Sequence, residues 1–82
     1  MQTLMQKRIP LNSLENGQRG LVFDIHECTF RPRLIEMGII KGTELTVLHR
    51  GILNGPLAIK VGTHTLALRL DECNYIIVEI SE

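Results

Sequence analysis

Five short segments in which apolar and polar residues alternate constrain this sequence more than any other feature. Alternation with a period of two predicts β-strands that each bury one face. Turn signals such as Lys41-Gly42 and Gly62-Thr63 separate the segments. The 82 residues are too few to cover both faces of an open sheet, so we predict that the strands curl into a small barrel. The segments are 21–26, 44–47, 57–61, 65–70 and 76–80.

One helix of about two turns is predicted between the first and second strands, where it would plug one end of the barrel. Pro32 suits the first turn of a helix, because its missing N–H would have no partner there. Leu34, Ile35 and Met37 are its apolar residues. Gly38 fits the left-handed position that ends a helix, so we expect a positive φ at this residue. A second, irregular or helical turn is expected over residues 70–74.

The length allows a single domain. Residues 1–8 are expected to form a flexible N-terminal lead, which leaves residues 9–82 as one small β-barrel domain. Aromatic residues are few, with two Phe, one Tyr and no Trp, so the core must be aliphatic. Cys28 and Cys73 lie far apart in the sequence and are interpreted as small buried hydrophobic residues rather than as a disulfide.

The charge balance excludes several classes of partner. Nine basic residues match nine acidic ones, whereas a nucleic-acid-binding protein normally needs a basic surface to neutralise phosphates.

No apolar run reaches the length of a membrane-spanning helix, and the first ten residues contain no apolar core of a signal peptide. We therefore expect a cytoplasmic protein without membrane insertion. A neutral chain also lacks charge repulsion against forming a homo-oligomer.

The sequence contains no recognised signature of catalysis. It lacks a phosphate-binding glycine loop, and no cysteine or serine lies in a local nucleophile motif, so no enzymatic activity is predicted. Asp24 and His26 are the candidates for a metal site, because they lie two residues apart on one strand and ferrous iron accepts both ligand types. Isolated strand residues of this kind are usually solvent-facing, so no cofactor or resident metal is expected.

A glycine-bounded connection between two strands is the most informative local feature. Ile52 and Leu53 are large apolar residues between Gly51 and Gly55, followed by Asn54. Loops lie on surfaces and often carry function, which suggests an apolar patch for a partner protein. The alternative interpretation is that one of the two side chains folds back and caps the barrel.

Together, several motifs make the chain resemble the FeoA family from about residue 9 to residue 80. The motifs are Leu11-x-x-Leu14-x-x-Gly17-x-x-Gly20, Arg33-Leu34-Ile35-Glu36-Met37-Gly38-Ile39, Gly42, Gly55-Pro56-Leu57 and Leu66-Ala67-Leu68-Arg69. The resemblance implies a mainly β fold, a small five-stranded Src-homology-3-like barrel with one or two short helices, related to the C-terminal domain of iron-dependent repressors. The chain departs from the family at Asn54-Gly55-Pro56, which lacks a frequent Asp, and at Pro32.

The resemblance also implies a function. We expect a non-catalytic accessory protein for ferrous-iron uptake that docks on the cytoplasmic part of the FeoB-type transporter at the inner face of the membrane. Ile52, Leu53 and Asn54 are the expected contacts, with the family-matching charges Arg33, Glu36 and Arg69, whose alternative role is surface ion pairing. Rival hypotheses are a metal-responsive regulatory module like the repressor domain, a small RNA-binding barrel and a structural homo-oligomer.

Overall fold

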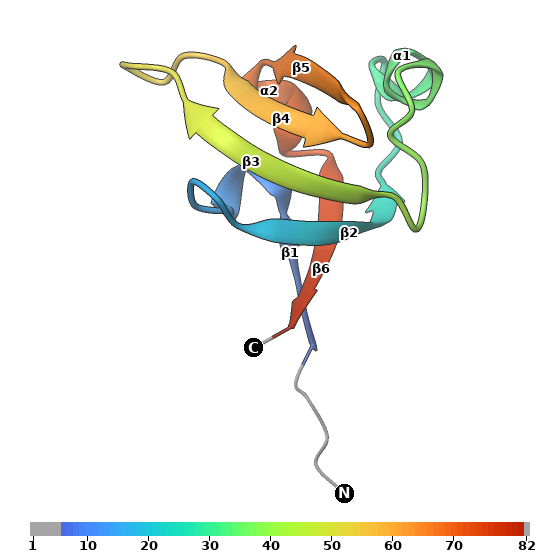
Figure 1. Cartoon of the computed structure of the whole chain (residues 1–82). Coiled ribbons are helices and arrows are strands. Elements are labelled where there is room, and N and C mark those ends of the chain that lie inside the picture. Colours follow the sequence, from blue (N-terminus) through green and yellow to red (C-terminus); the bar gives the residue numbers. More distant parts are fainter. Residues whose placement is uncertain (1–5, 82) are drawn as a thin grey trace, which may run out of the picture.

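Within the described residues, six antiparallel strands form one strongly curved sheet (Figure 1). Two short helices and one 3-10 turn accompany the sheet in this part of the chain. The computed structural model describes residues 6–81. The strand order is β1-β6-β2-β3-β4-β5, so β1 and β5 are the two edges. The elements are β1 Gln6–Pro10, η1 Leu11–Ser13, β2 Arg19–Ile25, α1 Arg31–Glu36, β3 Glu44–Arg50, β4 Leu57–Val61, β5 His64–Leu68, α2 Leu70–Cys73 and β6 Ile76–Ser81.

The predicted fold class is confirmed, but the sheet has one strand more than the five predicted. The additional strand is β1, which pairs antiparallel with β6 from Gln6, opposite Ser81, to Pro10. The expectation of a flexible lead is therefore wrong for residues 6–8, and residues 1–5 lie outside the described residues. The sequence of β1 shows no apolar alternation, because β1 is an edge strand on which only Ile9 packs against the core. Arg8 instead pairs with Glu79 across the strands, with 3.1 Å between Nε and Oε2.

A β-bulge changes which side chains of β2 face the core. Simple alternation groups Leu21, Phe23 and Ile25 on one face, but the register with β6 shifts between Val22 and Asp24. An extra residue on one strand resets the alternation of faces. Val22 and Ile25 are consequently buried, whereas Leu21 is exposed on the outer face.

The core is aliphatic, as predicted. Leucine, isoleucine and valine side chains from every strand except β1 fill it, together with Cys73. The aromatic rings stay at its margin: Phe30 packs partly against the core, and its ring centroid lies 6.0 Å from that of Tyr75. Burial of Cys73 confirms its interpretation as a small hydrophobic residue, but Cys28 is only half-buried, and both thiols are free.

The helix α1 begins and ends as the sequence predicts. Pro32 lies in its first turn, and Leu34 is its buried residue. At the end, Gly38 N donates to Ile35 O and Ile39 N donates to Leu34 O, both at 3.0 Å, which is the Schellman arrangement. The accompanying apolar contact is formed by Leu34 and Ile39, both fully buried. Within residues 6–81 no helix is long and apolar enough to cross a membrane.

A buried carboxylate joins the two helices. Glu72 is 2 % exposed, and its Oε1 accepts a hydrogen bond of 2.9 Å from the backbone N of Arg69 at the start of α2. Its Oε2 forms an ion pair with the guanidinium of Arg33 on α1. The Arg33 side chain is 61 % exposed, so solvent screens the pair, whereas the Glu72 carboxylate that it neutralises is buried. The contact joins α1 to α2.

The guanidinium of Arg50 holds the 3-10 turn against β3. It donates to the backbone oxygens of Asn12 and Leu14, which have no strand partner at this turn. The Asn12 side chain in turn donates to Oδ1 of Asn74, at 2.5 Å, beyond α2. Backbone oxygens of a partly buried turn need such partners, because an unpaired buried polar group is costly. The base of the β3–β4 hairpin is thereby fixed to the rest of the domain.

Replacing Gly38 should test the helix end. The φ of Gly38 is +93°, and a Cβ built there would find only Val61 Cγ1 at 3.9 Å, so the backbone and not crowding requires glycine. We expect Gly38→Val to lower the free energy of unfolding by about 1–2 kcal/mol in chemical denaturation. Gly38→Asn is the matched control and should lose less, because asparagine tolerates a positive φ. An unchanged midpoint for the valine variant would contradict this account.

Candidate functional site

The connection between β3 and β4 is a narrow hairpin that projects from the barrel (Figure 1). Gly51 N donates to Pro56 O at 2.8 Å, and Gly55 N donates to Ile52 O at 3.1 Å. A Cβ on Gly51 would lie 3.0 Å from the Cα of Gly55, tighter than most real Cβ contacts. The close approach of the two backbones therefore favours glycine at both positions. We call residues 51–56 the hairpin tip.

The tip displays two large apolar side chains. Ile52 is 88 % exposed and Leu53 is 94 % exposed, so neither caps the core. Leu53 and Asn54 have φ values of 55° and 61°, the left-handed geometry of a type I′ turn. Asparagine and glycine favour such positions, whereas a leucine there costs about 1–2 kcal/mol. Leu53 is therefore unfavourable for the turn conformation and adds no apolar contact to the core. This makes it a candidate for contact with another molecule.

A groove of about 500 Å³ lies at the base of the tip. Asn54 and Arg69, two of the residues predicted to contact a partner, line it together, and Ile52 and Leu53 belong to the same tip. The guanidinium of Arg69 forms no hydrogen bond or ion pair within residues 6–81, although pairing with Asp71 or Glu72 was the alternative prediction. The lining residues are Asn54, Gly55, Pro56, Arg69, Leu70 and Asp71.

The other two predicted contact residues, Arg33 and Glu36, do not join this groove. Both lie on α1, which Figure 1 shows at the opposite end of the molecule from the hairpin tip. Arg33 forms an ion pair with the buried carboxylate of Glu72. Ion pairing was the alternative role predicted for this residue. Glu36 is exposed and forms no ion pair within the described part of the chain.

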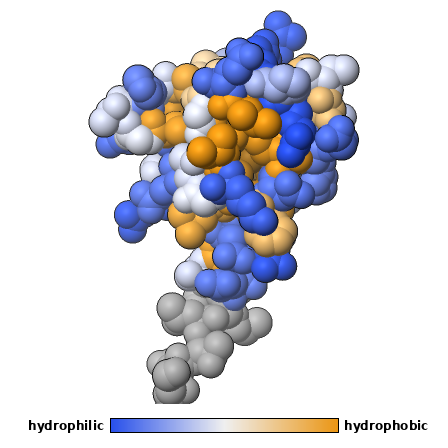
Figure 2. Space-filling model, turned by 90° about the vertical axis from the view of Figure 1, so that its right-hand side faces the viewer, coloured by the Kyte–Doolittle hydropathy of each residue, from blue (hydrophilic) through white to orange (hydrophobic). Residues whose placement is uncertain are grey.

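Sequence reasoning did not anticipate a second apolar area beside α1. Ile35 and Ile40 are exposed and line a groove of about 170 Å³ with Asp24, Arg31 and Lys41. Figure 2 views the face that carries α1 and shows apolar side chains there, interrupted by polar ones. The signal was present in the sequence: a helix of six residues can bury little more than Leu34, which leaves Ile35 without a place in the core.

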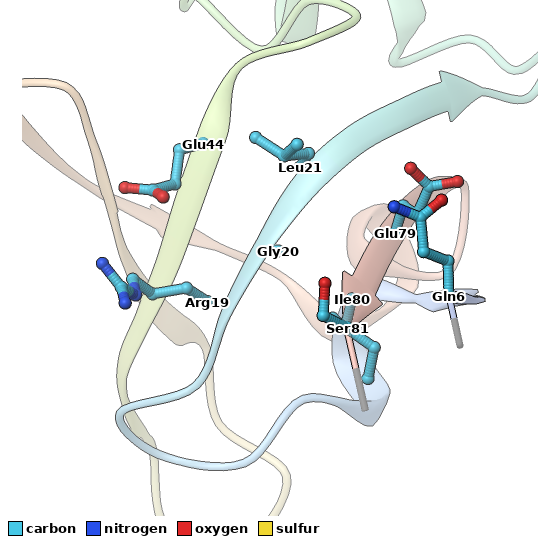
Figure 3. Close-up of a pocket in the computed structure, with 8 residues that line it drawn as sticks. All are labelled: Gln6, Arg19, Gly20, Leu21, Glu44, Glu79, Ile80 and Ser81. Carbon is cyan, nitrogen blue, oxygen red and sulfur yellow. The ribbon is translucent and has the colours of Figure 1, made fainter. Parts of the chain in front are cut away.

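A third groove, of about 370 Å³, runs between the outer sides of β2 and β6. Figure 3 shows Arg19 and Glu44 on one wall and Gln6 and Glu79 on the other. The groove holds no histidine or cysteine, and Ser81 is its only hydroxyl. Within residues 6–81, no histidine side chain is hydrogen-bonded to a serine or cysteine side chain.

The residues singled out for metal binding remain isolated. Both Asp24 and His26 are exposed near the end of β2, and Asp24 Oδ1 accepts a hydrogen bond of 2.9 Å from Ile25 N. No group of three or more histidine, cysteine, aspartate or glutamate side chains in residues 6–81 is close enough to hold an ion. A tight site usually needs more ligands than this pair can offer.

The sequence model of the FeoA domain matches residues 9–80, nearly the whole length. The chain belongs to the FeoA family. It is 28 % identical over 71 residues to a Campylobacter jejuni protein named for Fe(2+) transport, spanning 85 % of this chain and 96 % of that one. The FeoA-like protein of Clostridium acetobutylicum is 32 % identical with a TM-score of 0.85, and covers 93 % of this chain with 90 % of its own length.

Two further similarities concern the fold. Zinc-complexed FeoA of Stenotrophomonas maltophilia, described as a prokaryotic SH3 domain protein, has a TM-score of 0.75 at 25 % identity, covering 85 % of this chain and 93 % of that one. A manganese-dependent transcriptional repressor has a TM-score of 0.83 at 21 % identity, with 95 % of this chain matched to 44 % of the repressor. The Src-homology-3-like fold of this FeoA-family protein is thus confirmed, and part of the repressor has a similar fold.

The first prediction from the site concerns ferrous iron. Because Asp24 and His26 lack further ligands, we expect the isolated protein to show no stoichiometric site of sub-micromolar affinity in an oxygen-free calorimetric titration. Any weak binding should be the same in the control variant Asp24→Asn/His26→Ala. A tight site that disappears in His26→Ala would contradict this prediction.

The second prediction concerns the thiols. Burial raises the pKa of the Cys73 thiol to about 12, so it stays protonated and unreactive in the folded protein at pH values near 8. In a Cys28→Ser variant, we expect iodoacetamide to label Cys73 only after denaturation. Between about pH 9 and 12 the unfolded chain releases this proton while the folded chain retains it, so stability should fall across that interval. Equal labelling rates of folded and denatured protein would show that Cys73 is accessible.

Proposed function

We propose that this protein is a non-catalytic accessory protein of ferrous-iron uptake that works in the cytoplasm and docks on the cytoplasmic part of a FeoB-type transporter. Membership of the FeoA family and the Fe(2+)-transport name of its Campylobacter relative support the connection with iron transport. The hairpin tip is the proposed docking surface. It would hold the protein at the inner face of the membrane through the partner, without insertion.

Leu53 carries this proposal. A leucine that is 94 % exposed at a φ of 55° is unfavourable both as a surface side chain and as a turn residue. Surfaces that bind proteins commonly centre on a few large apolar residues surrounded by polar ones. Ile52 and Leu53 supply the apolar centre, and the polar surroundings come from Asn54 and Arg69 in the adjoining groove.

The groove suggests what the partner offers. The guanidinium of Arg69 has no partner within residues 6–81 and lies beside a mostly aliphatic tip, which favours a partner site with an apolar pocket and a neighbouring carboxylate. Docking can alter transport only if the tip binds one state of the transporter more tightly than another. The protein would then change the nucleotide cycle or the opening of the transporter through differential binding.

A metal-responsive regulatory module is the alternative function. The likeness to a manganese-dependent repressor is a likeness of fold at 21 % identity, and it brings no ligand set with it. The exposed tip is the observation that favours docking over metal sensing. The ferrous-iron titration described above separates the two functions, because a sensor needs a site and an adaptor does not.

Leu53→Asn separates docking from stability. Asparagine tolerates the left-handed turn, so we expect this variant to unfold at a free energy about 0.5–1 kcal/mol higher than the wild-type protein. Loss of an apolar anchor should cost about 2 kcal/mol or more of binding, well over tenfold in Kd. The measurement is a denaturant melt beside a titration with the purified cytoplasmic region of the FeoB-type transporter.

Leu48→Asn on β3 is the matched control. Leu48 is also exposed but lies in a strand, so the same substitution should not stabilise the protein and should leave docking unchanged. If Leu53→Asn were destabilised, Leu53 would be part of the fold rather than a docking residue. If it were stable and bound normally, the docking surface would lie elsewhere, and the groove between Ile35 and Ile40 would be the next candidate.

A further inference from the structure

The two edges of the sheet differ in a way that bears on self-association. At one edge, β1 carries Lys7, Arg8 and Pro10, residue types that discourage pairing with another strand. At the other edge, β5 reads His-Thr-Leu-Ala-Leu, with no proline, lysine, arginine or acidic residue. An edge strand without such features is a template for an incoming strand. The sheet is therefore protected at one edge and open to pairing at the other.

The register of β4 and β5 identifies the backbone groups at the open edge. Val61 pairs with His64 across the two-residue turn at 62–63, and Gly62 has the positive φ that such turns require. The residues that close a two-residue hairpin are hydrogen-bonded to each other, and bonded and non-bonded pairs then alternate along the strands. By this alternation, Thr65 and Ala67 direct their N–H and C=O groups away from β4. No other strand in residues 6–81 pairs with this side of β5.

The side chains along β5 leave room for a neighbour. Thr65 and Ala67 are small and exposed. Leu66 between them is partly buried and packs against the core, so it anchors the strand in place. Along residues 65–67, an incoming strand would meet no charged side chain. Pairing at this edge uses Thr65, Leu66 and Ala67, none of which belongs to the hairpin tip.

We infer that this protein forms a symmetric dimer in which β5 of one copy pairs antiparallel with β5 of a second copy, with the two-fold axis at Leu66. In this register Thr65 of each copy lies opposite Ala67 of the other, and the two Leu66 residues face each other. The strand places no charge opposite an identical charge, and the chain as a whole is neutral, so nothing electrostatic opposes the approach. This association is independent of the proposed docking on a transporter.

Charge variants test both the dimer and its register. In Thr65→Lys/Ala67→Lys, two pairs of lysines lie directly opposite each other, and we expect the dimer Kd to rise about tenfold or more. In the matched control Thr65→Glu/Ala67→Lys, each glutamate lies opposite a lysine, so association should persist with a Kd close to that of the wild-type protein. Sedimentation velocity of the purified full chain over a range of concentrations measures all three proteins, and circular dichroism checks their fold.

A proline substitution in β5 is a second test of the dimer. In Ala67→Pro the lost N–H is one that faces away from β4, so the fold should persist while the dimer is lost. A wild-type protein that remains monomeric at all concentrations would overturn the inference. So would a dimer that the two-lysine variant leaves unchanged, since its interface would lie elsewhere. Loss of association in the glutamate–lysine control would exclude the register about Leu66 and with it the proposed dimer.

Discussion

A single sheet has to provide both walls of the core in this protein, and most of the structure follows from that constraint. Each strand can bury only one of its faces, so the sheet must curl until buried rows from distant strands meet. Val22, Val47, Ile59 and Val78 come from four different strands and end in the same cluster. The bulge in β2 suits this aliphatic core, because it turns Ile25 inward where plain alternation would have placed Asp24.

The curled sheet leaves its ends open, and the two helices close the gaps with little apolar surface of their own. Each of them is anchored by specific polar contacts in addition to packing. Glu72 binds the start of its own helix through Arg69 N and the neighbouring helix through Arg33. A buried carboxylate needs partners for its oxygens, so these contacts favour one arrangement of the helices. The rigid frame explains how a short domain can hold a strained turn at the hairpin tip.

The sequence was enough to predict features that depend on neighbouring residues, such as the end of a helix. It was not enough to predict features that depend on contacts between distant segments. The helix end at Gly38 could be predicted because a single glycine at the end of an apolar face has one common explanation. The strand β1 could not, because an edge strand pairs through its backbone and needs no apolar pattern. The tip residues Ile52 and Leu53 were identified by their composition, but the groove that joins Asn54 to Arg69 depends on the meeting of two distant segments. The partner of Glu72 likewise depended on where α1 lies.

The pairing of β1 with β6 brings residues 6 and 81 side by side, on the side of the molecule away from the helices (Figure 1). A domain whose two ends leave together can be attached to another polypeptide, or inserted within one, with little disturbance of its fold. The same architecture occupies 44 % of a manganese-dependent repressor, where it forms part of a longer protein. The geometry of one strand pair thus explains how the same barrel can form part of a larger protein. Its loops can then diverge while the frame that presents them stays the same.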